Sequence, residues 1–137
     1  MGIRRNAREN ALQVLFQIEF NSGDLDEVLE EFRQSRRVKE KEREYGEHLV
    51  RGVIDHREEI DKIIQSHSKN WRISRMDLID RNLLRLAAFE MIYQPDLAPA
   101  IIINEAVEIA KKYGGKESAT FINGILDELR RECHERQ

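Results

Sequence analysis

The chain has 137 residues, of which 40% are hydrophobic and 36% charged, and its formal net charge at pH 7 is -3. This length predicts a single domain over residues 1–137, and the composition, with only two prolines, excludes a disordered or collagen-like chain. No apolar run approaches the ~20 residues of a membrane-spanning helix, and the amino terminus contains no apolar signal core. We therefore expect a cytoplasmic protein with no membrane partner.

Hydrophobic residues recur at helical spacing along nearly the whole chain, and the alternation typical of strands does not recur. This pattern predicts an all-α protein of six helices, or seven elements with a short extra turn near 74–77. The expected helices run from about 4 to 20, from Asp24 into the stretch 33–39, from 40 to 68, from a cap at Ser74 or Asp77 to Tyr93, from 99 to 113, and from a cap at Ser118 onward.

Three glycines mark features of the second half of the chain. Gly114 and Gly115 predict a left-handed stop after the fifth helix. Asn123-Gly124 looks like a hairpin turn as a dipeptide, but the apolar spacing continues through it and predicts a helix. A glycine inside a helix costs about 1 kcal/mol relative to alanine, and the usual compensation is close approach of a neighbouring helix or of a ligand backbone.

Charge is distributed unevenly along the sequence. Residues 1–8 contain only basic charges, residues 24–31 only acidic ones, and residues 33–43 are again mainly basic. Because the whole chain is acidic, any nucleic-acid binding must depend on such local clusters.

The first basic cluster consists of Arg4, Arg5 and Arg8. At the start of a helix each cation opposes the helix dipole by about 0.3–1 kcal/mol, so local helix stability does not explain the three arginines. Binding of phosphate groups would explain them. The alternative is a solvated basic tail.

Trp71, with Arg72 and Arg75 nearby, would suit stacking on a base, but a lone tryptophan at a helix junction more often fills the core, which is the interpretation that we favour. Cys133 is the only cysteine, and the four histidines match no metal-binding spacing. No catalytic constellation or phosphate-binding loop is present in the sequence. We therefore expect no enzymatic activity, no metal and no cofactor.

Several segments together resemble the NusB family of transcription antitermination factors. They are the start of the first helix (Arg8-Glu9 to Leu15-Phe16), the segment from Arg81 to Glu90, and above all INEAVEIAKKYG at 103–114 followed by FINGILD at 121–127. The resemblance covers nearly the whole chain. It implies an all-α fold whose six to seven helices form a two-part bundle around the long third helix.

The resemblance also implies an RNA-binding adaptor that performs no bond chemistry. Its partners would be the single-stranded boxA element of ribosomal RNA leaders, the small-subunit ribosomal protein NusE and the RNA polymerase antitermination complex. The RNA-binding residues implied are Arg4, Arg5, Arg8, Phe16, Lys116, Glu117, Ser118 and Phe121. Two positions depart from the family: Phe16 replaces a frequent tyrosine, and Ala119-Thr120 stands where relatives often carry a basic residue.

A protein-docking surface is expected on the second half of the chain, at Asp77, Asp80 and Arg81 on the exposed edge of the fourth helix. The alternative is that these are ordinary capping and solvated charges. Phe121 is likewise open to two interpretations, as a base-stacking platform or as part of the core. At the level of function, the alternatives are an adaptor module that acts with an RNA-modifying enzyme and a purely protein-binding scaffold without RNA affinity.

Overall fold

The computed structural model describes residues 3–21, 24–34 and 38–135, which form seven α-helices and one 3-10 turn with no strand among them. The helices are α1 (Ile3–Asn21), α2 (Leu25–Gln34), α3 (Glu40–Asp55), α4 (Arg57–Ser66), α5 (Leu78–Tyr93), α6 (Pro99–Tyr113) and α7 (Gly115–Glu135), and the turn η1 (Ile73–Arg75) precedes α5. The all-α prediction is confirmed. None of the described helices combines the length and hydrophobicity needed to cross a bilayer.

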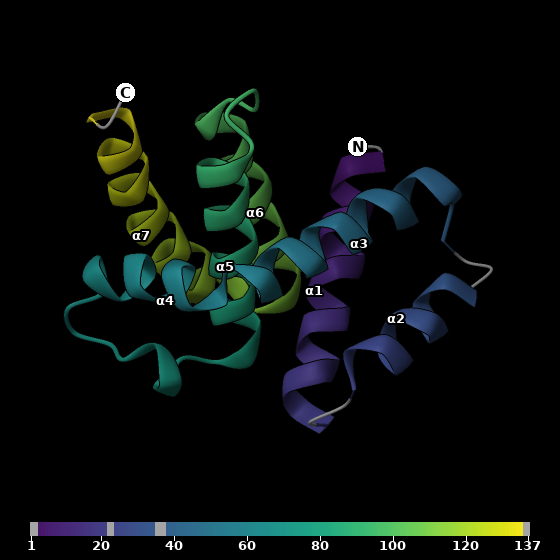
Figure 1. Ribbon diagram of the computed structural model, residues 1–137. Helices are drawn as coiled ribbons and strands as arrows, with labels where there is room; N and C mark the ends of the chain where they lie inside the picture. Colours follow the sequence, from purple (N-terminus) through teal and green to yellow (C-terminus); the bar gives the residue numbers. More distant parts are fainter. Residues whose placement is uncertain (1–2, 22–23, 35–37, 136–137) are drawn as a thin grey trace.

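The helices are arranged in two parts, as expected (Figure 1). Helices α1 and α2 pack with α3 on one side, while α4 to α7 form the other side. Helix α3 crosses α1 and leads directly into α4, and α5 lies against α1, α3, α4, α6 and α7. The two parts therefore share one continuous core.

Helix α5 occupies the centre of this core, as its nearly all-round hydrophobicity predicts. Every residue from Asn82 to Met91 is buried, including three polar ones that need partners inside the fold. The helix begins at Asp77, whose side chain accepts a hydrogen bond from the backbone N–H of Ile79 at 2.8 Å, so Asp77 is the cap.

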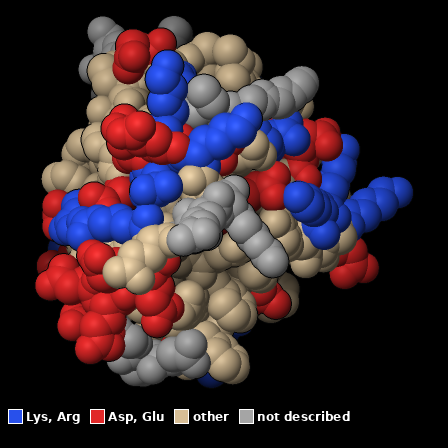
Figure 2. Space-filling model, turned by 90° about the vertical axis from the view of Figure 1, so that its right-hand side faces the viewer, with Lys and Arg blue, Asp and Glu red and all other residues tan. Residues whose placement is uncertain are grey.

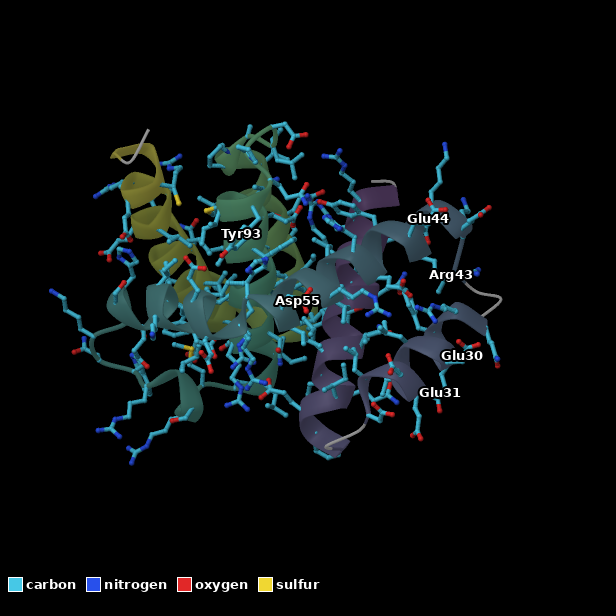
Figure 3. The ribbon with its side chains drawn as sticks, viewed as in Figure 1. Glu30, Glu31, Arg43, Glu44, Asp55 and Tyr93 are labelled. Carbon is cyan, nitrogen blue, oxygen red and sulfur yellow. The ribbon has the colours of Figure 1, made fainter. Side chains whose placement is uncertain are left out.

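The expected helix from about 40 to 68 is divided at His56, between α3 and α4. His56 leaves helical geometry (φ -113°, ψ 18°), although its N–H still bonds to the Gly52 carbonyl at 3.1 Å. The bend stacks the imidazole on the ring of Tyr93, with centroids 4.1 Å apart. Figure 3 shows Tyr93 on α5 above Asp55, the last residue of α3. The periodic pattern carried no signal for this break, because the contact joins residues far apart in sequence.

The last helix begins at Gly115 rather than at Ser118. The N–H of Gly114 closes α6 on the Ala110 carbonyl at 2.7 Å, and Gly115 has a φ of +90°, which confirms the left-handed stop. The prediction that Ser118 caps this helix is wrong, because Ser118 is buried in its first turns and its hydroxyl donates to Asp80. Asn123-Gly124 is helical, as predicted.

Acidic and basic side chains are interspersed over much of the face viewed in Figure 2, and a cluster of acidic ones lies at its lower left. Helix α2 contributes exposed acids, among them Glu30 and Glu31, which are labelled in Figure 3. Its hydrophobic side, with Val28, Leu29 and Phe32, is buried. Part of the predicted basic stretch, Arg36 and Arg37, lies outside the described residues.

Candidate functional site

Arg8, one of the three predicted phosphate ligands, lies inside the fold. Its residue exposure is 4%, and its guanidinium makes two hydrogen bonds to the Glu90 carboxylate, at 2.7 and 2.8 Å. The Tyr45 hydroxyl donates to the same carboxylate at 2.7 Å, and burial beside Glu90 raises the pKa of Tyr45, so the phenol stays protonated. Arg8 therefore has a structural explanation as the cation of a buried cluster.

The other two arginines differ from each other in exposure. Arg5 is partly buried and pairs with Glu105 of α6. Arg4 is exposed, and its guanidinium carbon lies 5.5 Å from the centre of the Tyr45 ring. Ion pairs with other helices thus account for Arg5 and Arg8, which local helix stability does not explain. Arg4, which has no ion pair within the described part of the chain, remains the one of the three whose charge faces solvent.

Phe16 belongs to an aromatic pair that the sequence analysis missed. It is partly buried and stacks on Phe20 one turn later, with centroids 5.6 Å apart and an interplanar angle of 10°. Phe20 is 68% exposed. The spacing of four residues on one helix was the available signal. A flat exposed ring beside a second ring is a suitable surface for stacking an unpaired base.

A pocket of about 350 Å³ is lined both by residues predicted to bind RNA and by residues predicted to bind the protein partner. We call it the aromatic pocket; it is lined by Trp71, Arg75, Met76, Asp77, Asp80, Gly114, Glu117, Ser118 and Phe121. Trp71 is 59% exposed, so its assignment to the core is wrong. Its ring meets that of Phe121 edge-on, at 6.4 Å and 82°. Phe121 is partly buried against the core, so both interpretations of this residue remain predictions.

The aromatic pocket is acidic. Asp77, Asp80 and Glu117 line it, against the single cation Arg75, and none of the three acids forms an ion pair with another described residue. Burial raises the pKa of Asp80, and the nearby Asp77 charge acts in the same direction against the hydrogen bond from Ser118. Such a pocket favours a cationic or hydrogen-bond-donating group over a phosphate. The described residues contain no group of three His, Cys, Asp or Glu side chains that could hold a metal ion.

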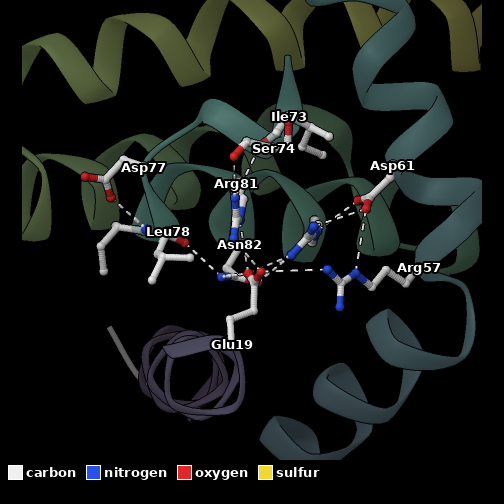
Figure 4. A network of polar contacts seen from close by, with 11 residues as sticks. Glu19, Arg57, Asp61, Ile73, Ser74, Asp77, Leu78, Arg81 and Asn82 are labelled. Carbon is white, nitrogen blue, oxygen red and sulfur yellow. Dashed lines mark hydrogen bonds and ion pairs between the residues drawn. The ribbon is translucent and has the colours of Figure 1, made fainter. Parts of the chain in front are cut away.

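Arg81, which is predicted to bind the protein partner, instead forms hydrogen bonds within the fold (Figure 4). Its guanidinium donates to Glu19 of α1 at 2.6 Å and to the Ser74 carbonyl at 3.1 Å. Glu19 also accepts from Asn82 at 2.7 Å and from Arg85 at 2.8 Å. Burial alone would raise the pKa of Glu19, but these donors hold it below its usual value. The expectation that Arg81 lies free on an exposed edge is therefore wrong.

Lys116 lies apart from the aromatic pocket, on the other side of α7. It lines a groove of about 500 Å³ between α6 and α7, which we call the α6–α7 groove. The lining residues are Ala100, Ile103, Asn104, Val107, Lys111, Lys116, Ala119, Thr120, Asn123, Asp127 and Arg130. Three of these are cations and one is an acid. The RNA-binding residues implied between Lys116 and Phe121 are thus divided between two surfaces of opposite charge.

Comparison with known proteins gives a consistent relationship over nearly the whole chain. The sequence profile of the NusB family matches residues 5–131. The transcription antitermination protein NusB of Trichlorobacter lovleyi is 51% identical over 129 residues, which is 94% of this chain and 91% of that protein. The protein of the same name from Myxococcus xanthus is 45% identical over 133 residues, with 94% and 95% covered.

Solved structures agree with these sequence relationships. NusB of T. maritima superposes with a TM-score of 0.86 at 37% identity, covering 94% of this chain and 91% of that one. A chain from a crystal structure of the antitermination factors NusB and NusE in complex with double-stranded RNA gives a TM-score of 0.81 at 30% identity, covering 96% and 98%.

Proposed function

The chain belongs to the NusB family, and we propose that it is a cytoplasmic antitermination adaptor that binds boxA-type single-stranded RNA together with the ribosomal protein NusE. In this role it supports processive transcription by RNA polymerase without making or breaking covalent bonds. The observation that carries the proposal is the pair of surfaces on either side of α7, one cationic and one acidic. Opposite charges on adjacent surfaces suit two partners of opposite charge.

The RNA belongs on the cationic side. Lys111 and Lys116 line the α6–α7 groove near the junction of the two helices, and Lys116 has no ion pair within the described part of the chain. Cations in such positions neutralise backbone phosphates and release counterions. Arg4 and the Phe16–Phe20 stack on α1 add a cation and a stacking surface to the proposed RNA-binding set.

The protein partner belongs on the acidic side. The aromatic pocket offers the exposed ring of Trp71 beside the carboxylates of Asp77 and Asp80, which form no ion pair with a described residue. A lysine or arginine side chain gains both a cation–π contact and a charged hydrogen bond in such a place. On this proposal Glu117, Ser118 and Phe121 serve the protein partner rather than the RNA.

Two charge reversals test the assignment. Lys116→Glu is expected to weaken boxA binding about tenfold or more in fluorescence anisotropy, because it replaces a phosphate contact with a repulsion. Asp80→Lys is expected to weaken NusE binding by a similar factor, measured by calorimetry. The matched control is Lys62→Glu, an exposed residue of α4 away from both surfaces. Failure of the unaltered protein to bind either ligand would refute the proposed function, and equal effects of all three variants would refute the division into two surfaces.

A further inference from the structure

The start of α6 and the connector before it expose a run of apolar residues. Four consecutive residues, Ala98, Pro99, Ala100 and Ile101, are all exposed, and Ile101, the largest of them, is 59% exposed. Pro95 in the connector is exposed as well. A run of three or four exposed apolar residues does not stabilise a fold and is typical of a surface that another molecule covers.

A pocket of about 530 Å³ lies beside this run, where the end of α5, the start of α6 and the end of α7 meet. We call it the α5–α7 pocket. In Figure 1 the connector between α5 and α6 and the end of α7 lie at the same end of the molecule. The apolar lining includes Met91 of α5, Leu97 of the connector and Pro99 of α6. The volume falls within the range of about 300–1,000 Å³ that is usual for ligand sites.

The charge of the lining indicates the class of ligand. Arg130 and Arg131 of α7 line the α5–α7 pocket, and no acid of the described chain does. Both arginines pair with the same carboxylate, that of Asp127, at 2.7 and 3.4 Å, and Asp127 lies outside the lining. The Arg131 side chain is 72% exposed. Two guanidinium groups that share one carboxylate keep a net positive charge, which favours an acidic ligand.

The α5–α7 pocket is distinct from the two surfaces of the proposed function. Asp80 of the aromatic pocket and Met91 of the α5–α7 pocket are separated by about 16 Å along α5. The α6–α7 groove is nearer, because Arg130 lines it as well, whereas Ala98 and Arg131 do not. Changes at Ala98 and Arg131 therefore test the pocket separately from the groove.

We propose that the α5–α7 pocket binds an acidic segment of a third protein, which inserts a large apolar side chain into the pocket and places a carboxylate beside Arg131. The exposed run continues past the pocket to Ile101, so the surface suits an extended segment better than a small molecule. In such a site the apolar anchor supplies affinity and the charged contact supplies specificity. The inference goes beyond the proposed function, whose ligands are boxA RNA and NusE.

Selection of a random peptide library on the full chain tests the class of ligand. We expect the enriched peptides to combine acidic residues with leucine, phenylalanine or tryptophan. Cys133, the only cysteine of the chain, is partly buried and lines the pocket, so its rate of alkylation reports whether the pocket is occupied. A synthetic copy of an enriched peptide should slow this alkylation in proportion to the fraction of protein bound. Failure to enrich any peptide, or enrichment of basic peptides, would refute the proposal.

Substitution of Ala98 separates binding from folding. Ala98 is the N-cap residue of α6, with an extended backbone (φ -67°, ψ 127°) and a methyl group that cannot cap the helix. Aspartate and asparagine are both good N-cap residues, so Ala98→Asp and Ala98→Asn should each raise the midpoint of thermal unfolding by about 2–6 °C.

The two variants of Ala98 should differ in peptide binding. Ala98→Asp adds a negative charge to the lining and is expected to weaken binding of the enriched peptide about tenfold. Ala98→Asn is the matched control and should bind the peptide as the unaltered protein does. Loss of affinity in a more stable protein does not come from unfolding. Equal affinities of the two variants for the peptide would overturn the proposed charge preference.

Arg131→Glu tests whether the site is separate from those of RNA and NusE. The reversal is expected to weaken peptide binding about tenfold or more, because it replaces an attraction with a repulsion. The midpoint of thermal unfolding should change little, since the side chain is exposed. Affinities for boxA RNA and for NusE are measured on the same variant and should match those of the unaltered protein. If Arg131→Glu keeps the peptide, or loses RNA or NusE to the same degree, the inference is wrong.

Discussion

Helices α1 and α7 differ in where their charged residues point: several on α1 face other helices, whereas those at the start of α7 face solvent. On α1, Arg5, Arg8 and Glu19 are turned toward α5 and α6 and are paired there with residues distant in sequence. On α7, Lys116 and Glu117 face outward and form no ion pair with a described residue. The same kinds of residue thus hold the bundle together in one helix and are available to other molecules in the other.

The difference follows from where each charge falls relative to the hydrophobic stripe of its helix. Arg8 precedes Ala11, Leu12 and Leu15 by three, four and seven residues, which is the spacing of the buried stripe, and Glu19 follows Leu15 by four. A charge on that stripe must find a partner within the fold. Clustering of charge in a sequence therefore indicates binding only where the cluster lies off the stripe.

The largest effect is expected for Arg8→Ala. This change leaves Glu90, which is 1% exposed, without its cation, and loss of one partner of a buried pair costs about 3–5 kcal/mol in the free energy of unfolding. Urea denaturation measures the loss. Arg4→Ala is the matched control and should cost less than about 1 kcal/mol, the value of an exposed cation–π contact. An Arg8→Ala protein of normal stability that no longer binds RNA would reverse the comparison between α1 and α7.

A smaller loss of folding stability is expected from Glu19→Gln, at the other end of α1. The pKa of Glu19 is lowered in the folded protein from its usual 4.5, so ionised Glu19 stabilises the fold above about pH 4.5, and this contribution is lost as the pH falls through the folded pKa. At pH 7 the variant should lose about 2 kcal/mol in the free energy of unfolding, because the acceptor of the hydrogen bonds from Arg81 and Arg85 loses its negative charge. The difference in the free energy of unfolding between Glu19→Gln and the unaltered protein, measured by urea denaturation, should become smaller toward pH 3.

The control for this pH dependence comes from α7. Glu128 is exposed, and its contact within the described residues is a 3.6 Å approach to the ring of His67. Glu128→Gln should leave the stability at pH 7 nearly unchanged, because an exposed charge contributes little to the free energy of unfolding. If the free energies of unfolding of Glu19→Gln and of the unaltered protein changed with pH in parallel, Glu19 would not stabilise the fold through its ion pairs.

The fold was largely predictable because it depends on local periodicity. The spacing from Ile102 to Tyr113, with Pro99 before it and Gly114 after it, specified α6 to within a residue. The break at His56 was not predictable, because the stacking partner Tyr93 is 37 positions away in a different helix. Local patterns report which residues face inward but not where two elements meet.

The candidate site was predicted less well, and the start of α7 explains much of the error. With the helix expected to begin at Ser118, Lys116 in the preceding loop and Phe121 in the first turn of the helix appeared to form one site. Because α7 begins at Gly115, the two residues point in directions roughly 140° apart around a helix of 3.6 residues per turn. Trp71 was misassigned for a different reason: a lone aromatic in a connector has no periodic context that reports its exposure.

Arg4 is the exception on α1 because its charge faces solvent. Its replacement tests whether it belongs with the cations proposed to bind RNA. It is exposed and unpaired like Lys116, although it shares a helix with the buried Arg8. If Arg4 contacts one RNA phosphate, Arg4→Ala should weaken boxA binding only a few fold at moderate salt. It should also reduce the slope of log affinity against log salt concentration by about 0.7, the value for one phosphate on a single strand. Because Arg8 is held inside the fold, a triple arginine variant would confuse unfolding with lost binding, whereas the single change does not. An unchanged slope would mean that Arg4 does not contact an RNA phosphate, and that the RNA-binding cations lie only on α6 and α7.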